Sequence, residues 1–585
     1  MTAQGNIYGI NGPIIYLKGD SGFQMNEMVY VGTGRLVGEV IGLTSERTTI
    51  EVYEETTGLK PGEPVTGTGA PVSATLAPGI LTSIFDGIER PLNAIQKESG
   101  CYIDRGIHAD SLDTKKKWHA HMTVKKGDRL YPGAVIAEVP ETRAITHKVM
   151  VPPDMEGFVL SVAEDGDYTI EEPLVTIQKK DGSEAVLSMT QKWPIRVPRP
   201  VSRRYPASRP LITGQRIVDT LFPLAKGGTA AIPGGFGTGK TMMQHQIAKW
   251  SDADIIIYIG CGERGNEMTQ VLEEFSELID PKSGNPLMDR TTLIANTSNM
   301  PVAAREASVY TAMTLAEYYR SMGLKVLLMA DSTSRWAQAL REMSNRMEEL
   351  PGPDAFPMDI SAIISNFYGR AGYVKLSNDE TGSITFIGTV SPAGGNLKEP
   401  VTENTKKVAR CFYALEQDRA DKKRYPAVNP IDSYSKYIEY PEFEEYIKGH
   451  INDEWIGKVN ELKTRLQRGK EIAEQINILG DDGVPIEYHV IFWKSELIDF
   501  VILQQDAFDE IDAVTPMERQ EDILNMIIDI CHTEFEFDNF NEVMDYFKKM
   551  INICKQMNYS KFKSEQYEGF QKQLKELIEE RKLQS

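Results

Sequence analysis

The sequence has few cysteines, no long apolar run and an excess of acidic over basic side chains. Its five cysteines, an odd number without CxxC spacing, do not suggest a disulfide framework and favour free thiols in a reducing compartment. No stretch approaches the ~20 apolar residues that a membrane-spanning helix needs. The segment from Met1 to Leu17 lacks the basic and apolar regions of a signal peptide. We therefore expect a cytoplasmic chain that only partners could tether to a membrane.

The formal net charge of −20 argues against broad nucleic-acid binding, which depends on basic surface that displaces counterions. We therefore expect no nucleic-acid partner. Apolar residues make up 41% and charged residues 25% of the 585 residues, as in an ordinary globular protein. At roughly 150 residues a domain, the length predicts about three or four domains.

Composition changes along the chain and predicts where these domains lie. Short β-forming runs separated by Gly-containing turns are typical of a small all-β barrel, and a second β-rich stretch reads as an inserted module. The β-forming runs are 14–17, 28–31, 36–41 and 48–53 in the first stretch and 134–139, 147–151 and 157–160 in the second. The predicted divisions are a barrel at 1–70, a connector that starts the central domain at 71–110, a β-rich module at 111–190, the central domain at 191–435 and a C-terminal helical domain at 436–585.

The central region alternates short apolar runs with helical segments, which indicates a buried parallel sheet covered by helices. The apolar runs are 230–232, 255–259, 292–295 and 326–330. Strand-forming runs then disappear, and a helical bundle is predicted. Its helices are expected at 455–476, 493–505, 516–530, 541–557 and 560–581.

The most specific motif is the run from Gly234 to Thr241, GGFGTGKT, which satisfies G-x-x-x-x-G-K-[ST]. A glycine-rich turn lets backbone N–H groups point at phosphate oxygens, and the next helix adds its positive N-terminal end. Lys240 would reach the β and γ phosphates, and the Thr241 hydroxyl would bind Mg²⁺. An unoccupied glycine-rich turn is the alternative, but a strand before the motif and a helix over 242–250 favour a nucleotide site in a RecA-like domain.

Two acidic residues follow apolar runs, where the ligands of such sheets gather. Asp331 has the place of a Mg²⁺-organising aspartate, although a helix cap is its commoner role. Glu263 could polarise an attacking water, and the adjacent Arg264 could neutralise phosphate charge. A surface Glu–Arg pair is the alternative for those two residues.

The remaining candidates are weaker. Tyr425 and Phe508 could form an aromatic slot for adenine, although composition alone makes both more typical of packing. His119 and His121 alternate as along a strand, but no Cys or carboxylate cluster in the sequence completes a metal site, so a metal is disfavoured.

The chain resembles the catalytic A subunits of V-type and archaeal-type (A-type) rotary ATPases. Three segments carry this resemblance: GERGNEM from Gly262 to Met268, NTSNMPVAAREAS from Asn296 to Ser308, and DSTSRWAQALRE from Asp331 to Glu342. The similarity extends over nearly the whole length and includes the inserted β module, which the related B subunits and F-type β subunits lack.

The resemblance implies a catalytic subunit that couples Mg-ATP hydrolysis or synthesis to rotation of a shaft and to transport of H⁺ or Na⁺. Glu263, Lys240 and Arg264 would be catalytic, Thr241 and Asp331 would bind Mg²⁺, the latter through water, and Tyr425 and Phe508 would flank adenine. The nucleotide-binding segment would comprise Gly234, Gly235, Phe236, Gly237, Thr238, Gly239, Lys240, Thr241 and Met242.

The resemblance also implies partners and a location. Three such chains would alternate with three B subunits, which supply an arginine finger. Shaft subunits D and F, peripheral-stalk subunits E and G and a membrane rotor sector would complete the complex. The chain would then lie at the cytoplasmic face of a membrane, as a peripheral part of that complex.

Some residues depart from the family pattern. Gly235 stands where Pro or Ala is common, Thr238 where Cys or Ala is common, and the segment 353–364 lacks an arginine expected near Ile363. Two other functions compete with the catalytic one: a nucleotide-binding but non-catalytic subunit, and a ring-shaped RNA helicase or secretion ATPase. The intact Lys240, Thr241, Glu263 and Asp331 argue against the first. The acidic balance and the inserted module argue against the helicase, and the segments 262–268 and 331–342 argue against both the helicase and the secretion ATPase.

Overall fold

The computed structural model describes residues 3–19, 21–100 and 102–583, and the chain divides into two compact units. The first comprises Met1–Tyr205, Ala253–Val390 and Lys398–Val408, and the second Pro206–Asp252, Ser391–Leu397 and Ala409–Ser585. Within the described ranges, no helix is both long and apolar enough to span a membrane. The domain boundaries expected at 70, 110, 190 and 435 remain predictions.

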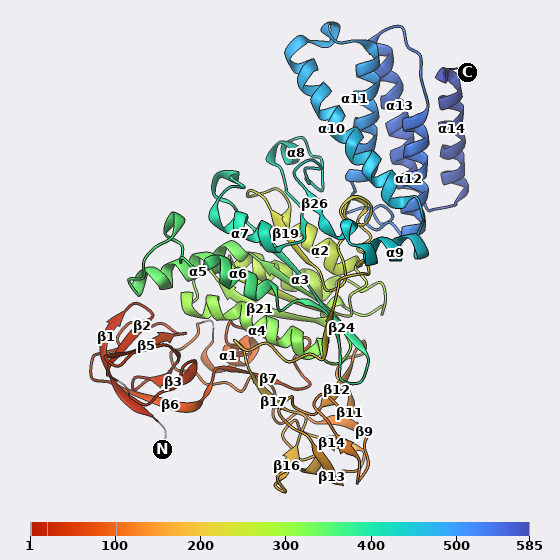
Figure 1. The fold of residues 1–585 in the computed structure, drawn as a ribbon. Helices are drawn as coiled ribbons and strands as arrows, with labels where there is room; N and C mark the ends of the chain where they lie inside the picture. Colours follow the sequence, from red (N-terminus) through yellow and green to blue (C-terminus); the bar gives the residue numbers. More distant parts are fainter. Residues whose placement is uncertain (1–2, 20, 101, 584–585) are drawn as a thin grey trace. The chain divides into compact units, whose positions relative to one another are not determined.

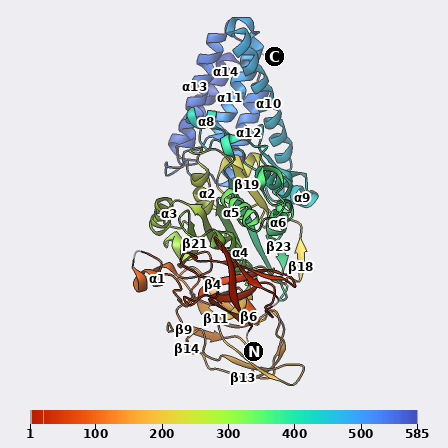
Figure 2. The same ribbon diagram turned by 90° about the vertical axis from the view of Figure 1, so that its left-hand side faces the viewer.

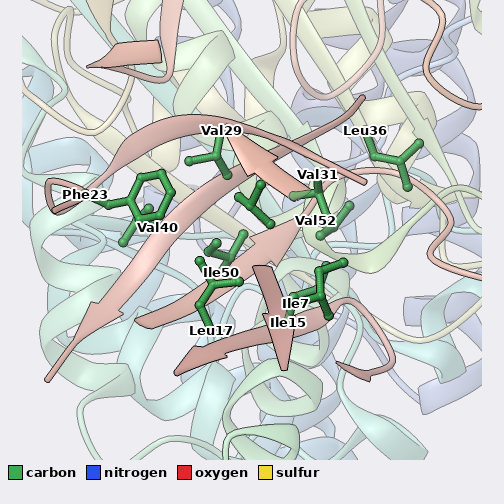
Figure 3. Close-up of a cluster of buried hydrophobic side chains, with 11 residues drawn as sticks. Ile7, Ile15, Leu17, Phe23, Val29, Val31, Leu36, Val40, Ile50 and Val52 are labelled. Atoms are coloured by element: carbon green, nitrogen blue, oxygen red, sulfur yellow. The ribbon is translucent and has the colours of Figure 1, made fainter. Parts of the chain in front are cut away.

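The first unit begins with a closed six-stranded barrel. Its strands follow the order β1-β2-β5-β4-β3-β6 and are β1 (Gln4–Asn11), β2 (Ile14–Lys18), β3 (Glu27–Val31), β4 (Leu36–Leu43), β5 (Arg47–Val52) and β6 (Pro64–Pro71). Strand alternation turns apolar side chains inward, and Ile15, Val29, Val40 and Ile50 meet in a core that is closed to solvent (Figure 3).

A β-rich module of two four-stranded sheets follows. One sheet has the order β10-β13-β15-β16 and the other β12-β11-β9-β14. The strands are β9 (Trp118–Met122), β10 (Arg129–Leu130), β11 (Val135–Pro140), β12 (Thr146–Met150), β13 (Gly157–Val162), β14 (Gly166–Tyr168), β15 (Val175–Gln178) and β16 (Glu184–Leu187). Strand β7 (Ser73–Leu76), which precedes the module in the chain, pairs with β17 (Gln191–Pro194), which follows it.

The rest of the first unit is a parallel sheet with helices. The parallel neighbours run in the order β8 (Ile84–Phe85), β21 (Thr291–Thr297), β20 (Ile255–Glu263), β22 (Lys325–Asp331) and β24 (Thr381–Val390). Antiparallel β23 (Gly372–Lys375) and β18 (Arg203–Tyr205) extend it. Helix α4 (Val302–Arg320) packs against the central strands and is buried along most of its length (Figure 1). The other helices are α1 (Leu92–Ser99), α3 (Gly265–Glu277), α5 (Thr333–Arg346), α6 (Ile360–Tyr368) and α7 (Pro400–Val408).

The second unit joins a small sheet to a helical bundle. Strand β19 (Thr229–Pro233) pairs in parallel with β25 (Cys411–Phe412), which pairs with antiparallel β26 (Tyr434–Ser435). Helices α10, α11, α13 and α14 run side by side in both views (Figures 1 and 2). The helices are α2 (Lys240–Trp250), α8 (Gln417–Asp421), α9 (Pro441–His450), α10 (Trp455–Leu479), α11 (Ile486–Ile498), α12 (Met517–His532), α13 (Phe540–Asn558) and α14 (Glu565–Arg581).

Two helix boundaries differ from the sequence-based expectation. The helix expected at 493–505 begins at Ile486, just after Pro485, and gives way at Asp499 to a short π-helical turn. The helix expected from 560 begins at Glu565, because Ser564 caps it by accepting the Tyr567 N–H and Lys563 has a positive φ of 59°.

Candidate functional site

In the second unit, the glycine-rich turn connects β19 to α2. Gly237 and Gly239 have φ of 79° and 91°, a backbone region open to glycine but costly for other residues. A Cβ on Gly234 would lie 2.6 Å from the Thr238 hydroxyl and 2.8 Å from the Leu415 Cβ, so only glycine fits there. The turn therefore brings the start of α2, at Lys240, close behind a loop of small residues, as phosphate binding requires.

Side chains of the turn bond back onto its own backbone. The Lys240 Nζ donates to the carbonyl oxygens of Gly234 at 2.9 Å and Gly235 at 2.8 Å. The buried Thr238 hydroxyl donates to the Gly235 carbonyl at 2.8 Å. An anion in this turn would offer Lys240 a stronger, charge-assisted partner than these neutral carbonyls.

Gly235 is not required by space. A Cβ built there would meet only the Gln417 Oε1 at 3.4 Å and a Thr238 methyl at 3.9 Å, and its φ is not positive. An alanine would fit this position sterically. Glycine here adds backbone freedom rather than a needed conformation.

The glycine-rich turn, the start of α2 and both predicted aromatic residues line one cavity of about 530 Å³. Gly237, Thr238, Gly239 and Met242 form one side, whereas Tyr425 and Phe508 come from other segments of the same unit. Phe508 is 85% exposed and Tyr425 is 43% exposed, so neither side chain is buried in a hydrophobic core. Exposed aromatic faces on a cavity of this size suit a flat heterocycle. Phe236 is also exposed.

Ion pairs that no sequence motif indicates hold the two aromatic segments. The buried Arg216 donates to Asp512 at 2.5 Å and to the Gln504 carbonyl at 2.6 Å, on either side of Phe508. Asp499 accepts from both Arg419 and Arg424, close to Tyr425 in the chain. Because the members of these pairs are 75 to 296 residues apart, no local pattern identifies them.

The first unit holds the two predicted carboxylates at the ends of adjacent parallel strands. Strand β20 ends at Glu263 and β22 at Asp331, and Gly260 pairs with Asp331 in register. Asp331 is buried and accepts hydrogen bonds from the Thr389 hydroxyl at 2.7 Å and the Tyr258 hydroxyl at 3.2 Å. Asp331 is thus an oriented carboxylate rather than a simple helix cap, since the N-cap residue of α5 is Ser332.

Glu263 has an unusual environment. Burial, the neighbouring Asp331 and the nearby Glu267 raise its pKa to about 8, against the opposing effect of Arg335. Gly262 has a φ of 71°, and a Cβ there would lie 2.9 Å from the Arg335 Cβ, so glycine lets this turn pass close to the arginine. Arg264 follows as the exposed residue before α3. A carboxyl group with a pKa near neutrality at a strand end is typical of functional sites.

Comparison with protein-family models covers most of the chain. The nucleotide-binding domain of the ATP synthase alpha/beta family matches residues 214–435, its beta-barrel domain 7–69, and its barrel-sandwich domain 109–196. The C-terminal domain of V and A type ATP synthase matches residues 444–541. These matches confirm the predicted fold class, from barrel and inserted module to nucleotide-binding domain and C-terminal helices.

Individual relatives agree with the domain matches. The V-type ATP synthase alpha chain of Halothermothrix orenii is 51% identical over 90% of this chain and 89% of its own. The A subunit of the A-type ATP synthase of Methanopyrus kandleri is 50% identical over the same shares. The chain belongs to the family of V-type and A-type ATP synthase A subunits.

As a member of this family, the chain is a catalytic ATP hydrolase and synthase subunit of a rotary, ion-coupled enzyme, which confirms the function expected from the sequence. The family is membrane-associated and its members work in multisubunit complexes. The assembled ATPase EscN of an enteropathogenic E. coli type III secretion system has a TM-score of 0.62, with 20% identity over 90% of this chain and 100% of its own. That likeness shows a shared fold only.

Proposed function

We propose that the second unit binds ATP or ADP in the 530 Å³ cavity, with adenine between Tyr425 and Phe508 and the phosphates at the turn from Gly234 to Met242. The observation that carries this proposal is that the lining of one cavity combines the glycine-rich turn with two exposed aromatic residues. Lys240 would leave the Gly234 and Gly235 carbonyls to pair with phosphate, and backbone N–H groups at the start of α2 would add donors.

Glu263 is the proposed general base, which orients and deprotonates the attacking water. Arg264 would contact phosphate charge, and Lys240 would stabilise the charge that develops on the transferred group. The pKa of Glu263 is about 8, and a Mg²⁺ ion bound nearby would favour its charged form.

Magnesium fits the donors that these residues offer. The Thr241 hydroxyl and the Asp331 carboxylate supply hard oxygen atoms, which Mg²⁺ prefers, and we assign Asp331 an indirect role through water. Bound Mg²⁺ would supply charge neutralisation at the phosphates. Thr389 and Tyr258 would keep Asp331 in one orientation for that task.

The proposed assembly follows the family. We infer a ring in which this chain alternates with B subunits that contribute an arginine finger, a shaft of subunits D and F, peripheral stalks of E and G, and a membrane rotor sector. The chain would then work at the cytoplasmic face of the membrane, and it would be a poor ATPase when isolated.

The test is Mg-ATP hydrolysis by this chain reconstituted with its B partner, with the variant Glu263→Gln. We expect nucleotide binding to survive and turnover to fall by at least about a hundredfold, since a positioned base is lost. Glu277→Gln, at the exposed far end of α3, removes the same charge and should leave turnover unchanged. Unchanged turnover in Glu263→Gln with ATP still bound would contradict the assignment and favour a non-catalytic role.

A further inference from the structure

Two exposed histidines of the inserted module share one face of the strand β9. His119 and His121 are two residues apart, so their side chains point to the same side, while Trp118 and Ala120 point inward and are buried. The histidine side chains are 63% and 66% exposed. Cα atoms two residues apart on a strand lie about 7 Å apart, a spacing at which two imidazoles can lean toward one ion.

Each imidazole is held by its own aspartate. The Nδ1 of His119 lies 2.8 Å from the Asp167 Oδ1, and the Nδ1 of His121 lies 2.5 Å from the Asp165 Oδ2. Asp167 pairs directly with His119 across the β9–β14 ladder, and Asp165 stands just before β14, where it also accepts the Met122 N–H at 2.8 Å.

Each aspartate lies at the Nδ1 atom of its ring. A neutral imidazole that donates its Nδ1–H to a carboxylate has an unprotonated Nε2 with an available lone pair. Histidines that bind metals in proteins have this arrangement, in which a carboxylate fixes the ring and makes the ligand more basic. Here the Nδ1 of each of two histidines, two residues apart on one strand, lies within hydrogen-bond distance of a carboxylate.

We propose that His119 and His121 form a two-imidazole binding site for a borderline divalent cation such as Zn²⁺, with Asp167 and Asp165 as the carboxylates that orient the rings. Imidazole nitrogen suits Zn²⁺, Ni²⁺ and Cu²⁺, whereas Mg²⁺ and Ca²⁺ prefer oxygen ligands. Glu138, paired with His121 on β11, adds a further negative charge beside the site.

The protein supplies only part of the coordination shell. Among the described residues, no group of three or more His, Cys, Asp and Glu side chains is arranged to hold a metal, so water or a side chain of a neighbouring protein would fill the remaining positions. Because the site is incomplete and lies on an exposed strand face, we expect the ion to bind reversibly and with moderate affinity, unlike a structural metal ion. None of the residues assigned to nucleotide takes part.

The experiment is calorimetric titration of the full-length protein with Zn²⁺, repeated with Cu²⁺ and followed by electron paramagnetic resonance. We expect the wild type to bind one more Zn²⁺ than the double variant His119→Gln/His121→Gln, and its Cu²⁺ spectrum to show coupling to two imidazole nitrogens. Asp165→Asn and Asp167→Asn should each weaken binding about 10- to 100-fold, since they remove only the orienting carboxylate.

A matched control is His532→Gln. His532 is also exposed and also pairs with a carboxylate, Glu461, at 2.8 Å, but it has no histidine two residues away. This variant should bind Zn²⁺ as the wild type does. Equal stoichiometry and affinity in the wild type and the double variant would overturn the proposal, and unchanged affinity in both aspartate variants would overturn the role given to the carboxylates.

Discussion

Glu89 is a buried acid whose protonation should make the stability of the first unit depend on pH. The residue is 1% exposed, and one carboxyl oxygen accepts the Thr75 N–H at 2.6 Å. Burial raises the pKa of Glu89 to about 8, although hydrogen bonds from Thr75 and Ser111 act in the opposite direction. The carboxyl group is therefore protonated in the folded protein at neutral pH.

The sign of the effect follows from proton binding. Between pH 4.5 and about 8, the folded protein keeps the Glu89 proton and the unfolded chain has lost it. The contribution of Glu89 to the free energy of unfolding is therefore fully present below the pKa that Glu89 has in the unfolded chain. It is lost as the pH rises through the pKa that Glu89 has in the folded protein, at about 1.4 kcal/mol per pH unit. The substitution Glu89→Gln removes the titrating group but keeps an oxygen for the Thr75 N–H, so it should remove this slope.

The assay is thermal unfolding of wild type and Glu89→Gln at half-unit steps from pH 5 to 8.5. We expect the variant's relative stability to grow with pH and to level off above about pH 8. Glu98→Gln, at an exposed acid on the neighbouring α1, should instead follow the wild-type curve at every pH. Parallel curves for wild type and Glu89→Gln would refute the argument, because they would mean that the pKa of Glu89 is the same in both states.

Two further substitutions test the aromatic slot and the helical bundle. Phe508→Ala should weaken ATP binding about 2- to 10-fold, because it removes one stacking face and leaves the phosphate turn intact. Equilibrium titration measures this change, and equal affinity in the variant would contradict an adenine contact. Gly469→Ala on α10 should lower stability by about 1–3 kcal/mol, because the added Cβ would lie 2.2 Å from the Ser495 Cβ on α11. Gly457→Ala, on the same helix with open space around it, should be neutral or stabilising in the same thermal assay.

Much of the fold follows from local patterns of side chains. Runs such as 36–41 and 48–53 predict β4 and β5 to within two residues, because alternating burial in a barrel leaves a regular trace. The barrel strands β1 and β6 are not among the predicted runs. Strand β1 buries only Ile7, and β6 reads PVTGTGAP, with glycine and proline that ordinarily indicate turns. Closure of the barrel, rather than propensity, places them in the sheet.

The candidate site likewise contains residues that local sequence patterns indicate and residues that only the folded structure reveals. Glu263 and Asp331 are local features of the first unit, because a parallel sheet presents its strand ends at one edge and each strand is visible as an apolar run. The glycine-rich turn of the second unit is a local sequence motif. The residues that position Tyr425 and Phe508 are not local. The Arg216–Asp512 pair joins the segment before β19 to the loop before α12, and neither residue stands in a recognisable motif. Only the folded chain shows why these arginines are buried.

The pair His119 and His121 shows most clearly that local sequence patterns miss contacts between distant residues. The spacing of His119 and His121 is visible in the sequence, but the sequence alone disfavours a metal there because no carboxylate cluster lies nearby. The carboxylates that matter, Asp165 and Asp167, come 44 and 48 residues after their partners and reach them through an antiparallel ladder. Antiparallel pairing of two strands brings residues that are far apart in the sequence into direct contact. A sequence motif can therefore contain the ligands of a site while the groups that make them good ligands are supplied by topology.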